Sequence, residues 1–444
     1  MSNKPVSTEP VRDARTLGGG RMLILGLQHM FAMFGATVLV PIITGLSVQV
    51  TLICAGLGTL FFHLCTKFKV PAFLGSSFAF LGGFTAVKML DTGIYANMTD
   101  AEKLPYACGG IVVAGLLYLV MAAVVKFVGI KRVMRFLPPV VTGPIIILIG
   151  LILAPTAVTS ASENWLLAGL AIAVIVFCNM WGKGMIKIIP ILLGVLVPYV
   201  VALCCGMIDF SAVADAKFLG LPPFQMAKFD ISAILIMAPI AIASMMEHIG
   251  DMSAISATCE ENYIQEPGLH RSLMGDGLAT ALAALFGGPA NTTYGENTGV
   301  LVLSKVYDPR VVRLAAYFAI ILSFSPKFAG IINSIPSAIV GGVSFVLYGM
   351  ISAVGVRNVV ENKVDFTNTR NLLIAAIILV SGLGFNGIGG LTFVIGGASI
   401  TLTGLAIAAI LGIVLNAILP GKDYDFGEDL QGDTSVTFQS NVKE

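Results

Sequence analysis

The stretches PAFLGSSFAFLGGF (Pro71–Phe84) and GGPANTTYGENTG (Gly287–Gly299) decide how this chain folds. Each lies among apolar segments, yet each has proline, glycine and hydroxyl residues where a membrane-spanning helix would have aliphatic ones. Unpaired backbone at membrane depth is tolerated only where it lines a cavity inside protein. Two such breaks at corresponding places in the two halves of a chain predict the central site of a transporter. The alternative, a pair of small-residue helix-packing segments, does not account for Glu296 in the second stretch.

The sequence around the two breaks is that of a membrane protein. Of 444 residues, 56% are hydrophobic and 11% are charged, against about 25% charged in soluble domains. Apolar runs of about 20 residues, the length that a helix needs to cross the hydrocarbon layer, recur from Leu23 to Leu419. A net charge of +1 excludes nucleic acid as a partner. We therefore expect an all-α polytopic membrane protein.

The apolar runs divide into two sets of seven. The first set occupies residues 22–46, 50–66, 71–87, 107–127, 138–157, 165–181 and 186–205. The second set occupies residues 231–256, 275–287, 289–303, 311–334, 338–354, 371–386 and 391–419. An odd number of spans in each half predicts an inverted repeat, residues 21–205 and 231–419, with the breaks in segments 3 and 10 of 14 transmembrane segments.

The basic residues give the orientation of these spans. Cytoplasmic loops of membrane proteins are enriched in Lys and Arg. With fourteen spans and a cytoplasmic N-terminus, most of the 26 Lys and Arg residues lie inside. The exceptions are Lys88, Lys103, Lys217 and Lys228, which lie outside, and Lys327, which lies within a span. We therefore expect both polar tails, residues 1–20 and 421–444, in the cytoplasm, and the second tail to be disordered.

Three carboxylates at membrane depth mark a candidate binding site. Segment eight, ISAILIMAPIAIASMMEHIGDMSAIS (231–256), carries Glu247, His248 and Asp251. Glu247 and Asp251 share a helix face because they are four residues apart, and Glu296 lies in the second break. A charge at this depth costs ~2.5 to 3.5 kcal/mol on the translocon scale, so an intramembrane carboxylate is by default a functional-site hypothesis.

Several of these residues have plainer alternatives. Asp251 needs no functional explanation if it lies at a wetted position near the cytoplasmic end of its span. His248 lies about 100° around the helix from Glu247, which favours a packing role. His29, beside Gln28 in the first span, is either a structural hydrogen-bonding residue or part of the proton path. The seven cysteines show no metal-ligand spacing, and we expect no metal site, no cofactor and no catalytic residue.

The residue types indicate the class of ligand. Helix N-termini at the two breaks would present free backbone N–H groups, which suit carbonyl oxygens or anions. The carboxylates of Glu247 and Glu296 accept hydrogen bonds from N–H donors and repel a permanent anion. A small planar ligand with alternating ring N–H and C=O groups satisfies both. This is the pattern of a nucleobase.

Four stretches resemble the bacterial uracil permeases of the nucleobase-ascorbate transporter family. They are LQHMFAMFGATVLVP (Leu27–Pro41), PAFLGSSFAF (Pro71–Phe80), MEHIGD (Met246–Asp251) and NTTYGEN (Asn291–Asn297). The resemblance covers nearly the whole chain and implies fourteen spans in a 7+7 inverted repeat. It also implies a core domain moving against a gate domain. The core domain would be residues 21–127 and 231–334, and the gate domain residues 138–205 and 338–419.

The resemblance implies roles for individual residues as well. Those matching the family's substrate site are Glu247, Glu296, Phe78, Gly295, Tyr294, Tyr348 and Ala36. The two glutamates would accept hydrogen bonds from the ring N–H groups of uracil. Phe78 and Gly295 would donate backbone N–H groups to its carbonyl oxygens, and Tyr348 would reach it from the gate domain. The residues expected to take part in proton coupling are Glu247, Asp251 and His29.

Two positions differ in the substrate class that they indicate. Uracil permeases usually have a second histidine where this chain has Asp251, whereas purine-carrying relatives usually have glutamine where it has Glu296. The sequence predicts a proton-coupled symporter that imports uracil across the plasma (inner) membrane by alternating access, with a homodimer as a further expectation. A xanthine or urate permease of the same family is the alternative. A passive channel and a membrane enzyme are competitors from other classes, disfavoured because no filter ring and no nucleophile–base pair appear.

Overall fold

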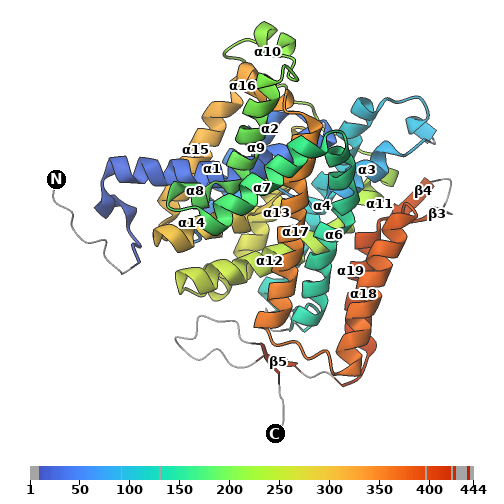
Figure 1. Ribbon diagram of the computed structural model, residues 1–444. Coiled ribbons are helices and arrows are strands. Elements are labelled where there is room, and N and C mark those ends of the chain that lie inside the picture. The colour runs from blue at the N-terminus through green and yellow to red at the C-terminus, as the bar shows by residue number, and fades with distance from the viewer. Residues whose placement is uncertain are drawn as a thin grey trace.

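The computed structural model describes residues 10–91, 93–129, 132–133, 135–395, 398–421, 424–426 and 438–440. The chain is mostly helical (Figure 1), as its long apolar runs predict. Within the described ranges, seven helices are long and apolar enough to cross a membrane. They are Gly19–Thr44 (α1), Val48–Cys65 (α2), Asp100–Val128 (α4), Pro139–Ser162 (α6), the consecutive Ile231–Met237 and Ile240–Cys259 (α11 and α12), Ser337–Glu361 (α17) and Thr369–Gly387 (α18).

Other apolar segments are shorter or broken. Pro309–Ser323 (α15) and Pro326–Asn333 (α16) are bent by 91° at the break between them. The single span expected over residues 311–334 is therefore interrupted, because Pro326 begins a new helix whose N-terminus is capped by Ser325. The shorter helices are Trp165–Trp181 (α7), Met185–Ile188 (α8), Pro190–Cys204 (α9), Ser211–Asp215 (α10), Leu269–Leu285 (α13) and Gly404–Ile418 (α19).

The last expected span, residues 391–419, is helical only in its second part. Leu391–Ile395 (β3) and Ala398–Leu402 (β4) pair as antiparallel strands before α19 begins. The preceding Gly389 and Gly390 adopt positive φ, which stops a helix. The β-branched residues that follow suit extended backbone.

The two breaks meet as a pair of strands. Leu74–Ser76 (β1) leads into the short helix Leu81–Lys88 (α3), and Asn291–Thr293 (β2) leads into Gly295–Ser304 (α14). The strands are antiparallel, with Leu74 opposite Thr293 and Ser76 opposite Asn291, and all their residues are buried. We call this strand pair the central ribbon. Tyr424–Phe426 (β5) and Phe438–Ser440 (β6) pair near the C-terminus, and the rest of the expected C-terminal tail lies outside the described residues.

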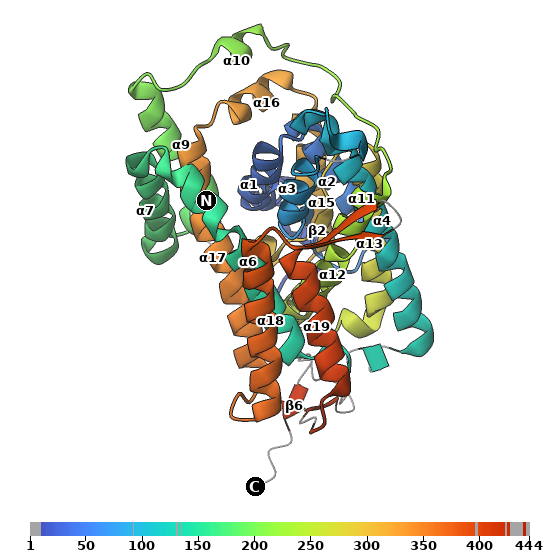
Figure 2. The same cartoon turned by 90° about the vertical axis from the view of Figure 1, so that its right-hand side faces the viewer.

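Small residues bring the helices together in two groups. In the first helix group, α4 packs on α13 and α15 packs on α1 and α2. A Cβ on Gly115 would lie 2.6 Å from the carbonyl oxygen of Gly277. In the second helix group, α17 packs along α6 and α7, and α18 packs on α19 and α6. A Cβ on Gly150 would lie 2.1 Å from the carbonyl oxygen of Tyr348. Close approach through glycine is typical of packing between membrane helices, and the two groups lie side by side in Figure 2.

The N-terminal segment, residues 11–17, joins the ends of α12 and α14. Its Val11 pairs in parallel with Val306, just beyond α14. Its Arg12 donates a hydrogen bond of 3.0 Å to the carbonyl oxygen of Cys259, the last residue of α12. This N-terminal clamp shows that part of the expected polar tail, residues 1–20, is folded against the helices. Residues 1–9 lie outside the described residues.

The connection between α9 and α11, residues 205–230, passes over one end of both helix groups (Figure 2). Its second part is hydrogen-bonded to the first helix group. Gly220 N–H donates to the carbonyl oxygen of Phe324 at 2.9 Å, and Ala227 N–H donates to that of Leu285 at 3.0 Å. This part of the connection is therefore attached to the first group.

Candidate functional site

The central ribbon leaves two backbone N–H groups at its end. Phe78 lies in the turn between β1 and α3, and Gly295 is the first residue of α14. Neither amide has a hydrogen-bond acceptor among the described residues. For Gly295 this is expected, because amides in the first turn of a helix have no acceptor within that helix; Phe78 lies before α3 begins. Both N–H groups are therefore available to a ligand with carbonyl oxygens.

Two carboxylates lie on neighbouring helices. Glu247 is on α12 and Glu296 is in the first turn of α14, and these helices pack against each other. The Oε2 atom of Glu247 is buried and has no hydrogen-bond partner in the described part of the chain. A buried acceptor without a partner is costly, so this oxygen is suited to an N–H donor from a ligand.

Asp251 lies beside the same helix N-terminus. Its Oδ2 accepts a hydrogen bond of 3.0 Å from Thr293 Oγ1, on strand β2. A Cβ on Gly295 would lie 3.6 Å from Asp251 Oδ1. The carboxylate is half-buried and hydrogen-bonded to the ribbon. The alternative from the sequence was a wetted position near the end of the span.

His248 bonds to α13 and also contacts the ribbon, with its Nδ1 3.4 Å from Thr293 Oγ1. Its Nε2 lies 3.0 Å from Ser272 Oγ, and its Nδ1 lies 3.0 Å from Asp276 Oδ2. All three side chains are fully buried. Sequence reasoning missed Asp276, although the signal was present, because this carboxylate stands between Gly275 and Gly277 at the start of an expected span.

His29 and Ala36 come from α1. The side-chain amide of Asn297, next to Glu296, donates to His29 Nδ1 and to the His29 carbonyl oxygen, both at 3.1 Å. His29 is therefore held against the first turn of α14. Ala36 is buried on the same helix.

Tyr294 holds the ribbon together. Its hydroxyl donates a hydrogen bond of 3.0 Å to the carbonyl oxygen of Ser76 and lies 3.4 Å from Thr37 Oγ1. A Cβ on Gly75 would lie 2.3 Å from the Tyr294 ring, so only glycine fits beneath it. The hydroxyl of this expected pocket residue is engaged with strand β1.

Tyr348 approaches from the second helix group. It is on α17, is 1% exposed, and has its ring edge-on to that of Phe78, with 5.9 Å between the centroids. Its hydroxyl, like that of Ser344 one turn earlier, is buried without a hydrogen-bond partner among the described residues. The Tyr348 hydroxyl is therefore a fourth group without a partner, after the Glu247 oxygen and the two amides.

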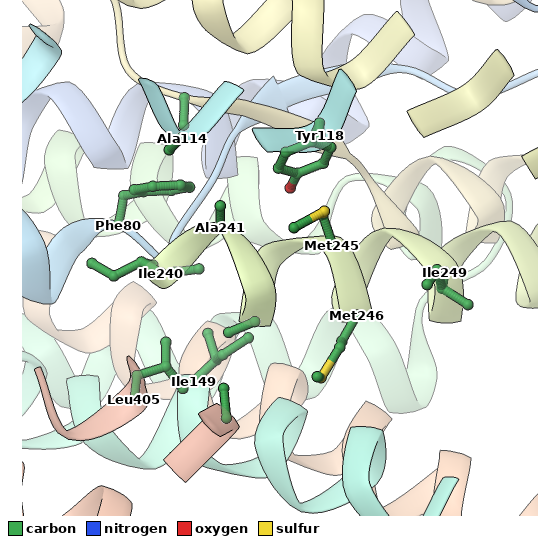
Figure 3. Close-up of a cluster of buried hydrophobic side chains, with 14 of the residues drawn as sticks. Phe80, Ala114, Tyr118, Ile149, Ile240, Ala241, Met245, Met246, Ile249 and Leu405 are labelled. Carbon is green, nitrogen blue, oxygen red and sulfur yellow. The ribbon is translucent and has the colours of Figure 1, made fainter. Parts of the chain in front are cut away.

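Apolar packing on two sides fixes the position of α12 (Figure 3). Met245 points toward Tyr118 of α4, whereas Ile240 lies on the side of Ile149 and Leu405, from α6 and α19. A small pocket lined by Phe78, Ile149, Ile240 and Leu405 lies on that second side. The carboxylates of α12 are thus carried by a helix seated between the two groups.

The arrangement offers hydrogen-bond donors and acceptors. Within the described ranges, no set of His, Cys, Asp and Glu residues could hold a metal ion. Two amides and a tyrosine hydroxyl can donate, and two glutamates can accept. This combination suits reversible binding of a small polar ring.

A family model and several curated proteins match this chain. The model of the Permease family matches residues 20–389. The uracil permease of Bacillus caldolyticus is 43% identical over 435 residues, which are 95% of this chain and 96% of that protein. The uracil permease of Escherichia coli K12 is 37% identical over 405 residues, which are 89% of this chain and 90% of that protein.

Solved transporter structures share the fold. The transmembrane domain of a cyanobacterial bicarbonate transporter, BicA, superposes with a TM-score of 0.61 at 17% identity, covering 86% of this chain and 98% of that domain. The murine anion transporter Slc26a9, in its inward-facing state, gives 0.65 at 10% identity, covering 94% of this chain and 69% of that chain. At these identities the likeness concerns the fold alone.

Proposed function

The chain belongs to the Permease family, and from this membership we propose that it is a proton-coupled symporter that imports uracil by alternating access. Relatives that are 37% to 43% identical over most of the chain are named uracil permeases. These names favour uracil over xanthine or urate. Permeases move solutes without converting them, so we assign no catalytic residue.

The observation that supports the proposal is that groups without partners lie on elements that contact one another around the central ribbon: the Oε2 atom of Glu247 on α12, and the amides of Phe78 and Gly295. Glu247 and Glu296 would accept hydrogen bonds from the two ring N–H groups of uracil. The amides of Phe78 and Gly295 would donate to its two carbonyl oxygens. Tyr348 would contact the ligand through its unpartnered hydroxyl, while Ala36 and Tyr294 would form the walls.

We propose the 7+7 inverted repeat of fourteen spans as the architecture behind this site. The antiparallel pairing of β1 with β2 supports it, because each strand comes from the third segment of its half. In this proposal, the core domain comprises residues 21–127 and 231–334, and the gate domain residues 138–205 and 338–419. The domains would rock about the site, as in other repeat-built transporters.

Proton coupling is assigned to the carboxylate cluster and its neighbours. Glu247 and Asp251 are one turn apart on α12, and His29 contacts the first turn of α14 through Asn297. Carboxylates this close titrate as a group. We propose that uracil and a proton enter together and that the inward membrane potential drives the import.

The proposed location is the plasma (inner) membrane, with both termini in the cytoplasm. The excess of Lys and Arg in the loops that would then face inward supports this orientation. A homodimer is proposed as the assembled form.

Transport by the purified protein in liposomes tests the function. Labelled uracil should accumulate inside when the outside is more acidic, and an uncoupler should abolish the accumulation. Excess unlabelled uracil should compete far better than xanthine. Accumulation of xanthine in place of uracil, or equilibration that ignores the uncoupler, would refute the substrate or the coupling respectively.

A further inference from the structure

Two buried threonines flank the central ribbon in the same way. Thr59 on α2 donates its hydroxyl to the carbonyl oxygen of Leu74 at 3.2 Å, and accepts from the N–H of Leu74 at 2.9 Å. Thr280 on α13 donates to the carbonyl oxygen of Asn291 at 2.8 Å, and accepts from its N–H at 3.1 Å. Both threonines are at most 1% exposed. Each hydroxyl thus satisfies both backbone groups of one strand residue.

Among the described residues, no other group bonds the backbone of these two strand residues. In an antiparallel pair, alternate residues turn both backbone groups away from the partner strand. Leu74 and Asn291 are residues of this kind, because their N–H and C=O groups reach the threonines instead of the opposite strand. A strand edge left unpaired at membrane depth costs several kcal/mol per group. The threonine hydroxyls therefore satisfy one outward-facing residue on each strand of the central ribbon.

Each anchored residue precedes its proposed ligand donor by the same number of residues. Leu74 precedes Phe78 by four residues, and Asn291 precedes Gly295 by four residues. The intervening backbone is held by Ser77 N–H, which donates to Ala290. Fixing the strand edge therefore fixes the direction of the amide at its end.

We propose that Thr59 and Thr280 are positioning residues that aim the Phe78 and Gly295 amides at the transported base. The inference rests on the proposed function for the identity of the ligand, but the anchoring itself does not depend on it. The hydroxyls act through the ribbon and do not contact the ligand.

Substitution by valine tests the proposal, because valine keeps the shape of threonine and removes only the hydroxyl. Thr59→Val and Thr280→Val should each weaken uracil binding by about tenfold, as expected for two buried groups left unsatisfied. The KM for transport should rise similarly, with kcat less affected. Thr59→Ser and Thr280→Ser should keep the affinity for uracil and the KM of the unmodified protein, since serine supplies the same hydroxyl.

Thr51→Val is the matched control. Thr51 is equally buried on α2, but its hydroxyl donates to Ser47 within the same helix, at 2.9 Å. This variant should bind uracil as the unmodified protein does. Loss of binding in the control to the same degree would show a general packing effect and overturn the positioning role.

Hydrogen exchange separates this inference from the choice of ligand. In the valine variants, the amides of Leu74 and Asn291 should exchange at least tenfold faster without any ligand present, and the serine variants should protect them again. If exchange and binding are unchanged in the valine variants, the inference is wrong even though uracil binds. If the unmodified protein binds no uracil, the proposed function fails, while the exchange result still decides the anchoring.

Discussion

At the scale of single residues, replacing Glu296 tests whether its carboxylate accepts a hydrogen bond from uracil. Glutamine has the same shape but puts an amide donor where an acceptor is needed. A mismatched buried polar pair costs roughly 1 to 3 kcal/mol, so Glu296→Gln should lower the affinity for uracil by roughly tenfold to hundredfold. Calorimetry in detergent measures this. Glu266→Gln, at an exposed position paired with Lys69, is the control, and unaltered affinity in Glu296→Gln would remove this residue from the site.

Replacing Tyr348 should affect the stability of the empty protein and the binding of uracil in opposite directions. Its hydroxyl is buried without a partner among the described residues, so Tyr348→Phe should leave the empty protein equally stable or up to about 1 kcal/mol more stable. The same change should weaken uracil binding, because the ligand loses a donor. Thermal unfolding with and without uracil measures both effects. Tyr317→Phe, at an exposed position, should change neither, and full ligand stabilisation in Tyr348→Phe would show that the hydroxyl does not reach uracil.

Asp251 tests the proton path separately from binding. Asp251→Asn should abolish accumulation driven by a pH gradient while leaving exchange of internal for external uracil partly intact. Glu247→Gln should abolish both, because it also removes an acceptor for the ligand. Counterflow and gradient-driven uptake in the same liposomes distinguish the two, with the exposed Asp91→Asn as control. Full gradient-driven accumulation in Asp251→Asn would leave Glu247 as the candidate carrier on α12.

At the scale of elements, the N-terminal clamp ties together the helices that carry the acidic residues. Arg12 bonds the end of α12 and forms an ion pair with Glu261, whereas Arg15 bonds only within the clamp, to Asp13. Arg12→Ala should speed hydrogen exchange in the last turn of α12 and reduce transport by about twofold to fivefold, in keeping with the loss of about 1 kcal/mol of hydrogen bonding. Arg15→Ala should do neither. Equal effects of the two changes would contradict the bridging role.

The clamp should also be insensitive to mild acid. Hydrogen bonds from Arg15 lower the pKa of Asp13 from its ordinary 3.8 to about 2. A carboxylate with a lowered pKa stabilises the folded form above its ordinary pKa, and that contribution is lost only as the pH falls through the lowered value. The clamp therefore keeps this charge throughout the range in which a proton gradient operates.

The sequence predicts the elements of the site better than their contacts. Proline, glycine and threonine at membrane depth reveal both breaks, and Glu247, Asp251 and Glu296 stand out because charge there is costly. The pairing of β1 with β2, the anchoring by Thr59 and Thr280, and the folding of the N-terminal clamp depend on contacts between distant segments, which no local pattern encodes. Hydropathy predicts continuous spans across the bend at Pro326 and across the strands before α19, because it does not report backbone direction.

At the scale of the whole molecule, the two helix groups should move relative to each other. Gly250 on α12 faces the second group, since a Cβ there would lie 4.0 Å from Asn358 Nδ2 of α17. A Gly250→Cys, Asn358→Cys pair, in a background without the native cysteines, should crosslink to an extent that uracil changes. The pair Val11→Cys, Val306→Cys joins the N-terminal clamp to the segment just beyond α14 and should crosslink equally with and without uracil. A yield independent of uracil at the first pair would argue against a moving gate.

The connection between α9 and α11, which passes over both groups, limits where this motion can be absorbed. Residues 217–228 are hydrogen-bonded to the first group, so relative movement has to be absorbed between Cys205 and Ala216, where Gly206 has positive φ. This places the expected hinge in a short, identifiable stretch.

The central ribbon also constrains how the protein is made. Strand β1 emerges from the ribosome with the first half of the chain, and its partner β2 is not synthesised until more than 200 residues later. Until then, the nascent first half sits in the bilayer with an open strand edge that only Thr59 and the surrounding helices can shield. Insertion and assembly are therefore distinct stages in its biogenesis. Any message that ends before Asn291 yields a membrane-embedded fragment whose incomplete strand exposes it to membrane quality control.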